Sequence, residues 1–352
     1  MDIEPDHDSP TGGGADNDAA DHDAADRGSG AFRHTPVLVE RVTELLGAVP
    51  DGTYVDATLG GAGHAVALLT AHPGLTLLGL DQDPAALAAA RARLAPLEAR
   101  ATLRHTRFDR LAEAVADHGG PPVTAVLFDL GVSSPQLDRG ERGFSHRVDA
   151  PLDMRMDTTV ADRTAADVVN DYGQDELARI LRDHADERHA GRIARAIVAA
   201  RPVISTGQLA DVVRDAIPAP ARRRGGHPAK RSFQAIRIEV NQELEILPDA
   251  LDQALDVLAP GGRIAVLAYH SGEDRIAKAR LREAATGGCT CPPGLPCGCG
   301  AVPTIRLLRP GAWKASAEEI DTNPRAASAR LRAAEKLPPD THLSPDLHRG
   351  AQ

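Results

Sequence analysis

Short apolar runs alternate with segments that carry apolar residues at helical spacing from residue 53 onward. The runs TYVDAT, LTLLGLD, ATLRH and VTAVLFDL predict four strands. Helices are predicted between them over Gly63–Ala71, Pro84–Leu94 and Leu111–His118, and Asp83 before the second of these is typical of a helix N-cap. Strands that alternate with helices usually pair in parallel, so the pattern predicts an α/β fold.

The alternation stops after residue 130, and residues 162–217 carry helical patterns without a strand. We therefore interpret residues 140–229 as a helical insert that recognises the substrate. The segments on either side, 31–139 and 230–335, are expected to form one α/β domain.

Strand and helix patterns resume after the insert. A helix is predicted over 238–258, followed by a turn at Pro260-Gly261-Gly262, the strand RIAVLAYH and a helix over 273–285. We expect the late strand TIRLLRP to complete the sheet at its edge.

Composition separates the ends of the chain from its middle. The first thirty residues hold nine acidic side chains against one basic side chain, Arg27. This composition is typical of a disordered acidic tail, which we predict over 1–30, with a second flexible tail over 336–352. The acidic tail carries most of the net charge of −10, so a local basic patch on the folded part can still attract a polyanion.

The chain contains neither an N-terminal basic segment followed by an apolar stretch nor an apolar run of about eighteen residues. We therefore expect no signal peptide, no membrane span and a cytoplasmic location. The sequence does not decide between a monomer and a homodimer.

A glycine turn follows the first predicted strand, which ends at Asp56. Gly60, Gly61 and Gly63 flank Ala62 and lead directly into a helix. Glycines let the backbone approach a ligand, and a helix N-terminus offers free N–H groups. An ordinary tight turn without a ligand is the alternative reading.

The spacing of the acids and glycines distinguishes between nucleotide cofactors. Asp81 ends the second strand, where a carboxylate can accept hydrogen bonds from both hydroxyls of a ribose. The turn lacks the G-x-G-x-x-G spacing of pyrophosphate binders, and Asp56 favours a ligand with an ammonium and a sulfonium. The pattern therefore predicts S-adenosylmethionine as the cofactor.

Candidate groups for chemistry follow the third and fourth strands. Phe108 either stacks on adenine or packs in the core. Asp129 ends the fourth strand, and Ser133, Ser134 and Pro135 follow it in a compact polar loop that is suited to holding an amine acceptor. Asp129 either accepts a hydrogen bond from that amine or contacts only the cofactor.

Two further segments offer candidate substrate contacts, each with a structural alternative. In APLDMRMD, Arg155 contacts phosphate or base, or the segment only seats the insert on the main domain. His270, at the end of the strand RIAVLAYH, is either a general base or a cap of the following helix.

A basic cluster lies near the end of the insert and is the main candidate contact for a phosphate backbone. It comprises Arg222, Arg223, Arg224, Lys230 and Arg231. The adjoining Phe233 is a candidate for stacking on a base.

The four cysteines of the chain, Cys289, Cys291, Cys297 and Cys299, lie together in one Pro- and Gly-rich segment. Their clustering is compatible with a tetrahedral zinc site, although the C-x-C spacing differs from the usual C-x2-C. A loop of reduced thiols is the alternative.

Several long motifs resemble those of one family. They are FDLGVSSPQLDRGERGFS, APLDMRMD, RIARAIV, HPAKRSFQAIRIEVNQELEIL, LAPGGRIAVLAYHSGEDR and NPRAASARLR. In these motifs the sequence resembles the MraW family of small-subunit ribosomal RNA methyltransferases, and the resemblance covers nearly everything from His34 to about Arg332.

The resemblance implies a class I S-adenosylmethionine-dependent methyltransferase: a Rossmann-like parallel sheet with an antiparallel edge strand and an inserted helical domain. It also implies methylation of the exocyclic amine, N4, of a cytidine in the decoding region of small-subunit ribosomal RNA, either free or in the assembled subunit. The cofactor contacts of the family fall on Ala62, Gly63, His64, Asp81, Phe108, Asp129 and Gln136.

The sequence departs from the family pattern at two positions. Ala62 stands where many relatives have Gly, and HSGEDR from His270 stands where relatives commonly show HSLEDR. Three other classes share parts of the pattern. An NAD-linked oxidoreductase requires a different glycine spacing, and a non-catalytic RNA-binding factor would not need the strand-end acids. A DNA methyltransferase is separated from the RNA enzyme only by its substrate.

Overall fold

The computed structural model describes residues 36–133, 136, 139–160, 163–223, 226–292 and 298–339. The tail predicted over 1–30 and most of that predicted over 336–352 lie outside these residues. Four candidate site residues also lie outside them: Ser134, Pro135, Arg224 and Cys297.

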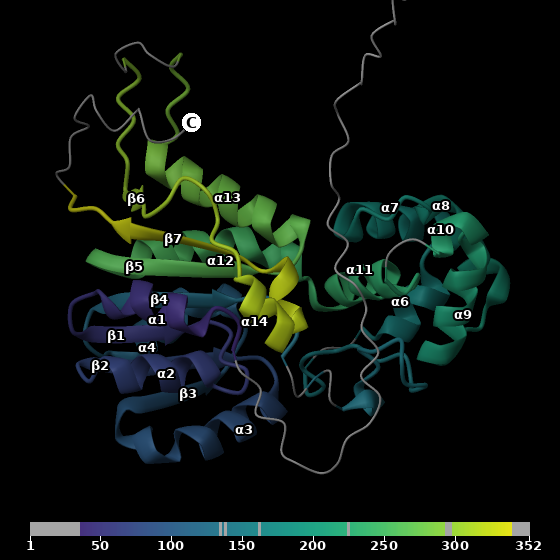
Figure 1. Ribbon diagram of the computed structural model, residues 1–352, viewed down its shortest axis with the longest axis horizontal. Helices are drawn as coiled ribbons and strands as arrows, with labels where there is room; N and C mark the ends of the chain where they lie inside the picture. The colour runs from purple at the N-terminus through teal and green to yellow at the C-terminus, as the bar shows by residue number, and fades with distance from the viewer. Residues whose placement is uncertain are drawn as a thin grey trace, which may run out of the picture.

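Within the described residues, one sheet has the strand order β3-β2-β1-β4-β5-β7-β6 (Figure 1). The strands are β1 (Gly52–Asp56), β2 (Leu75–Asp81), β3 (Ala101–His105), β4 (Val123–Asp129), β5 (Leu258–Ala268), β6 (Ile305–Leu307) and β7 (Arg330–Lys336). Strands β1 to β5 pair in parallel, whereas β7 is antiparallel to both β5 and β6. The carboxyl ends of the five parallel strands therefore share one edge, where open α/β sheets bind ligands.

Helices cover both faces of the sheet and give three layers. One face packs against α1 (Val39–Gly47), α2 (Gly63–Ala71), α3 (Pro84–Leu94) and α14 (Ala317–Thr322). The other packs against α4 (Leu111–His118), α12 (Glu243–Val257) and α13 (Ser271–Thr286). Because both faces are covered, β1 is buried along its whole length.

The helices between β4 and α12 form a separate lobe with its own apolar core (Figure 1). They are α6 (Ala165–Asp171), α7 (Gln174–Ala185), α8 (Ala190–Ala200), α9 (Thr206–Ala216), α10 (Ala219–Arg222) and α11 (Lys230–Asn241). The core of this lobe includes Ile236 and Val240 of α11, so it extends past the boundary that the sequence predicted at residue 229. No helix in the described part of the chain is both long and apolar enough to cross a membrane.

The structure agrees with most predicted elements and differs from the prediction at several places. The bounds predicted for β2, β3, α2, α3 and α4 match, and β6 lies at the sheet edge as expected. Three elements, α1, α14 and β7, were not predicted. The single helix predicted over 238–258 is wrong, because a left-handed residue, Gln242 with φ of 56°, separates the end of α11 at Asn241 from the start of α12 at Glu243. The predicted turn at Pro260–Gly262 lies inside β5, where the pairing shifts from Val123 with Leu258 to Ala125 with Arg263, so the extra residues form a bulge.

Candidate functional site

Three acids end neighbouring strands at the ligand-binding edge of the sheet. Asp56 ends β1, Asp81 ends β2 and Asp129 ends β4, and these strands are adjacent in the order β2-β1-β4. Parallel pairing brings the three carboxyl groups to one edge, as the sequence predicted. The site is therefore acidic before any ligand binds.

The glycine turn between β1 and α2 has a strained and closely packed backbone. Gly60 and Ala62 both have left-handed backbones, with φ of 51° and 58°. This conformation costs a non-glycine residue such as Ala62 about 1–2 kcal/mol. A Cβ on Gly63 would lie 2.3 Å from Cγ of Pro36, so no larger residue fits there without movement.

Asp56 is buried beneath the turn and is held from two sides. The Tyr54 hydroxyl donates to Oδ2 over 2.8 Å, and the Thr58 backbone N–H donates to Oδ1 over 3.3 Å. Burial nevertheless dominates and raises the pKa of the Asp56 carboxyl from 3.8 to about 6. A cation placed beside this group would lower its pKa again, which suits a cationic ligand.

Asp81 connects the glycine turn to the start of α3. Its Oδ2 accepts from the Gly60 backbone N–H at 2.7 Å, and its Oδ1 accepts from that of Asp83 at 2.8 Å. Burial raises the pKa of this carboxyl to about 6, while the two backbone hydrogen bonds oppose the rise. Each carboxylate oxygen has a further lone pair that a ribose hydroxyl can use.

Asp129 lies between the glycine turn and the end of β5. Its Oδ1 accepts a 2.7 Å hydrogen bond from the Tyr269 hydroxyl, and its side chain is 29% exposed. The neighbouring β1 loop fixes its backbone, since the Asp129 N–H donates to Oγ1 of Thr58 over 2.6 Å. This carboxylate is thus both oriented by the protein and accessible to a ligand.

Two polar side chains beside the turn are buried without a hydrogen-bond partner among the described residues. Neither ring nitrogen of His64, which is 5% exposed, makes such a bond, although Nε2 lies 3.5 Å from Oδ2 of Asp129. The Ser133 hydroxyl is in the same situation. Buried polar groups normally have partners, so these atoms fit a site that receives a polar ligand such as S-adenosylmethionine.

Gln136 and Phe108, two further predicted cofactor contacts, interact with protein groups. The Gln136 amide donates to Oδ2 of Asp83 over 3.1 Å and accepts from the Ser133 backbone N–H over 3.0 Å. Gln136 therefore joins the loop after β4 to the cap of α3. The Phe108 ring packs edge to face on Phe128 with centroids 5.9 Å apart, which matches the core-packing alternative.

The segment APLDMRMD seats the insert on the main domain. Arg155 is paired with Asp153 through two contacts of 2.8 Å. The side chain of Asn241 bonds the backbone of Met154 and Met156 on either side, each at 2.8 Å. On the main-domain side, Oδ2 of Asp157 lies 2.9 Å from Nε2 of His105 at the end of β3. The segment therefore joins the insert to the main domain, which favours the seating role over a wall of the acceptor pocket.

His270 caps α13. Its Nδ1 accepts from the Glu273 backbone N–H, and the Glu273 carboxylate accepts from the backbone N–H of both Tyr269 and His270. This reciprocal pattern is a capping box. The geometry therefore supports the capping alternative for His270.

The basic cluster is split between surface and paired side chains. Arg223, Lys230 and Arg231 are exposed, and Arg231 also donates to the Asp186 carbonyl at 3.4 Å; Arg222 is partly buried and lies 3.6 Å from Asp215. The prediction for the adjoining aromatic is corrected. Phe233 is 4% exposed and packs in the insert core, so its ring does not face an incoming base.

Sequence reasoning missed the two tyrosines that orient the acids. Tyr54 lies two residues before Asp56 on β1, and the period of two along a strand places both side chains on one face. This spacing is visible in the sequence and could have identified the pair. Tyr269 directly follows β5, but its pairing with Asp129 becomes visible only when β4 and β5 lie side by side.

Comparison with known proteins gives close relatives over nearly the whole chain. Residues 31–337 match the MraW methylase family. Ribosomal RNA small subunit methyltransferase H of Thermobifida fusca is 55% identical over 326 residues, covering 91% of this chain and 98% of that protein. The protein of the same name from Mycolicibacterium gilvum is 56% identical over 311 residues, covering 86% and 83%.

A solved structure with a similar chain course is an rRNA methylase from Streptococcus thermophilus. It matches with a TM-score of 0.37 and 14% identity, covering 85% of this chain and 94% of that one. The predicted class I fold and S-adenosylmethionine as the cofactor are confirmed. On the family match and the two relatives, the chain belongs to the MraW methylase family.

Proposed function

We propose that the protein transfers the methyl group of S-adenosylmethionine to N4 of a cytidine in the decoding region of small-subunit ribosomal RNA. The observation that carries this proposal is the accessible Asp129 carboxylate, which Tyr269 orients next to the glycine turn. The two relatives described above are named for small-subunit ribosomal RNA, which supports that RNA as the substrate.

When bound, S-adenosylmethionine supplies an electrophilic methyl group on a sulfonium. Three acidic or buried polar groups of the chain suit such a cofactor. Asp81 would accept hydrogen bonds from the ribose hydroxyls, and Asp56 would face the positive charge. His64 would gain the hydrogen-bond partner that the described residues do not give it.

The acceptor amine of cytosine is a weak nucleophile because its lone pair is conjugated with the ring. Alignment toward the methyl group and a hydrogen bond from the amine to a carboxylate both raise its reactivity. Tyr269 occupies Oδ1 of Asp129, so Oδ2 is the atom that would accept from the amine. The surplus proton leaves to water after transfer.

The loop after β4 would form the other wall of the acceptor pocket. Ser133, Ser134 and Pro135 were predicted there, and the last two lie outside the described residues. Ser133 adjoins the glycine turn, since its Cβ lies 3.6 Å from the position of a Cβ on Gly60. A base placed against this loop would therefore also be close to the cofactor turn.

The insert would supply the electrostatic contact with RNA. Arg223 and Lys230 are exposed on it, and Arg222 lies nearby. Phosphate contacts give affinity without sequence specificity, so this surface would position the RNA while the β4 loop selects the base.

A deletion strain provides the test. Nucleosides from its small-subunit RNA should lose N4-methylcytidine at the decoding region by mass spectrometry. The wild-type gene and an Asp117→Asn variant, which alters an exposed acid outside the site, should both restore the modification. An Asp129→Asn variant should not. Unchanged N4-methylcytidine in the deletion strain would refute the proposal.

A further inference from the structure

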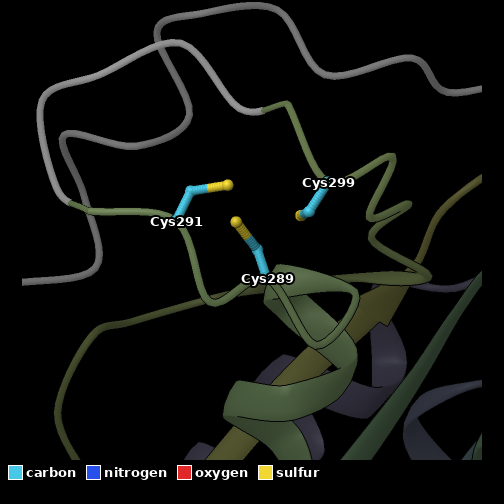
Figure 2. A group of neighbouring side chains, drawn as sticks. All are labelled: Cys289, Cys291 and Cys299. Atoms are coloured by element: carbon cyan, nitrogen blue, oxygen red, sulfur yellow. The ribbon is translucent and has the colours of Figure 1, made fainter.

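Three cysteine sulfurs converge at the end of α13, outside the methylation site. The sulfur atoms of Cys289, Cys291 and Cys299 all lie within 4.8 Å of one another (Figure 2). In a tetrahedral zinc site with Zn–S bonds of about 2.3 Å, the sulfurs are about 3.8 Å apart. Shifts of about 1 Å would therefore bring these three sulfurs into coordination distance.

The fold brings the two ends of this cysteine segment together at its base. After α13 the chain turns through Gly287 and Gly288, with φ of 62° and 72°. The returning chain passes so close that a Cβ on Gly287 would lie 2.5 Å from backbone atoms of Val302. A backbone hydrogen bond from Thr304 to Ala284, 2.9 Å long, fixes the crossing. The sulfurs thus meet because the backbone is clamped beneath them.

The segment has almost no apolar side chains with which to hold the sulfurs together. Between residues 289 and 303 the only large apolar residues are Leu295 and Val302, and Val302 is 51% exposed. Cysteine is usually a buried residue, yet Cys299 is exposed and the other two are only partly buried. Small segments that lack a core are commonly stabilised by a metal ion.

We infer that Cys289, Cys291 and Cys299 bind one zinc ion as thiolates and that this ion clamps the segment to the end of α13. Thiolates are soft ligands that select zinc over magnesium or calcium. Binding forms three Zn–S bonds and releases the three thiol protons to solvent. A water molecule or a further ligand completes the tetrahedron.

The surroundings suit the negative charge that three thiolates bring to one zinc ion. A groove of about 450 Å³ runs along α13 beside Cys289, and its lining includes Arg275, Lys278 and Arg282. Arg282, one turn before the end of the helix, is the nearest of these cations along the chain and would offset part of the excess charge, while Glu283 in the same lining opposes it.

Elemental analysis of the full-length protein, purified without chelators or a metal-affinity tag, tests the site. We expect about one zinc per chain in the wild type and in a Thr290→Ala control, which retains every thiol. The variants Cys289→Ser and Cys299→Ser should hold less than about a tenth of that. Zinc that stays at full occupancy in both cysteine variants would contradict the assignment.

Cobalt substitution provides a test that does not depend on folding of the variants. Wild-type protein stripped of metal and reduced should bind one Co²⁺ and show the near-ultraviolet charge-transfer band of cobalt–thiolate bonds. Absence of that band, together with absence of zinc, would overturn the inference, as would a disulfide between these cysteines in freshly purified protein. Binding of S-adenosylmethionine, measured by calorimetry, should be the same in Cys289→Ser and wild type, which separates this result from the proposed methylation.

Discussion

Replacing Asp56 by asparagine should stabilise the ligand-free protein while weakening its binding of the cofactor. Asp56 is buried, and burial raises the pKa of its carboxyl from 3.8 to about 6. Ionisation of this group at neutral pH therefore costs the folded state about 3 kcal/mol. Asparagine removes that cost and can still accept from Thr58, so we expect a gain of about 2–3 kcal/mol in the free energy of unfolding.

The sign of the pH dependence follows from the raised pKa. Between pH 3.8 and about 6 the folded state binds more protons than the unfolded state. The contribution of Asp56 to the free energy of unfolding of the wild type therefore falls as pH rises through that window. The advantage of Asp56→Asn should therefore be complete above about pH 6, about half as large at pH 5, and absent toward pH 4.

Urea denaturation at pH 7.5 and pH 5, followed by circular dichroism, measures the stability difference. Calorimetry measures the dissociation constant for S-adenosylmethionine, which should rise roughly 30-fold or more because a charge facing a cation is lost. Asp117→Asn, at an exposed position, should change neither quantity. A ligand-free Asp56→Asn protein less stable than wild type at pH 7.5, or one with unchanged cofactor affinity, would refute the reasoning.

Three further substitutions test other contacts. Tyr269→Phe removes the hydroxyl that donates to Asp129 and should lower the single-turnover rate of methyl transfer about 10- to 100-fold, with little change in cofactor affinity. An unchanged single-turnover rate would exclude an orienting role for Tyr269. Arg142→Met leaves the buried Asp83 carboxylate without its 3.0 Å ion pair and should lower the free energy of unfolding, measured in urea, by about 3 kcal/mol. Arg110→Met, which removes a surface ion pair, should leave the urea midpoint of unfolding unchanged. Lys230→Ala should reduce by about one the slope of log affinity against log salt for small-subunit RNA, and a constant slope would show that this side chain makes no phosphate contact.

Local patterns predicted the parallel part of the sheet well because its central strands β1, β2 and β4 are largely buried on both sides. In β2 only Thr76 interrupts the apolar run before Asp81, and α3 begins with a cap whose side chain accepts from Ala85 as expected. Strand β7 was missed because four of its seven residues are charged, and its buried residues Leu331, Ala333 and Ala334 do not form a recognisable apolar run.

Contacts between distant segments explain what the sequence did not reveal about the site. The acids at the strand ends were predicted correctly because the carboxyl ends of parallel strands form the ligand-binding edge of an α/β sheet. The hydrogen bond from Tyr269 to Asp129 spans 140 residues, and that from Gln136 to Asp83 spans 53, so neither leaves a local pattern. Phe233 is a different case, because Ile236 and Val240 follow it at helical spacing and form an apolar stripe that indicates a buried face.

Methyl transfer in a purified system tests the central claim most directly. Purified protein, deuterium-labelled S-adenosylmethionine and small-subunit RNA from the deletion strain, offered both free and as assembled subunits, are incubated and digested to nucleosides. We predict a labelled methyl group on N4 of cytidine from the decoding region with at least one of the two substrates. Label on another nucleoside, or none with either substrate, would contradict the account.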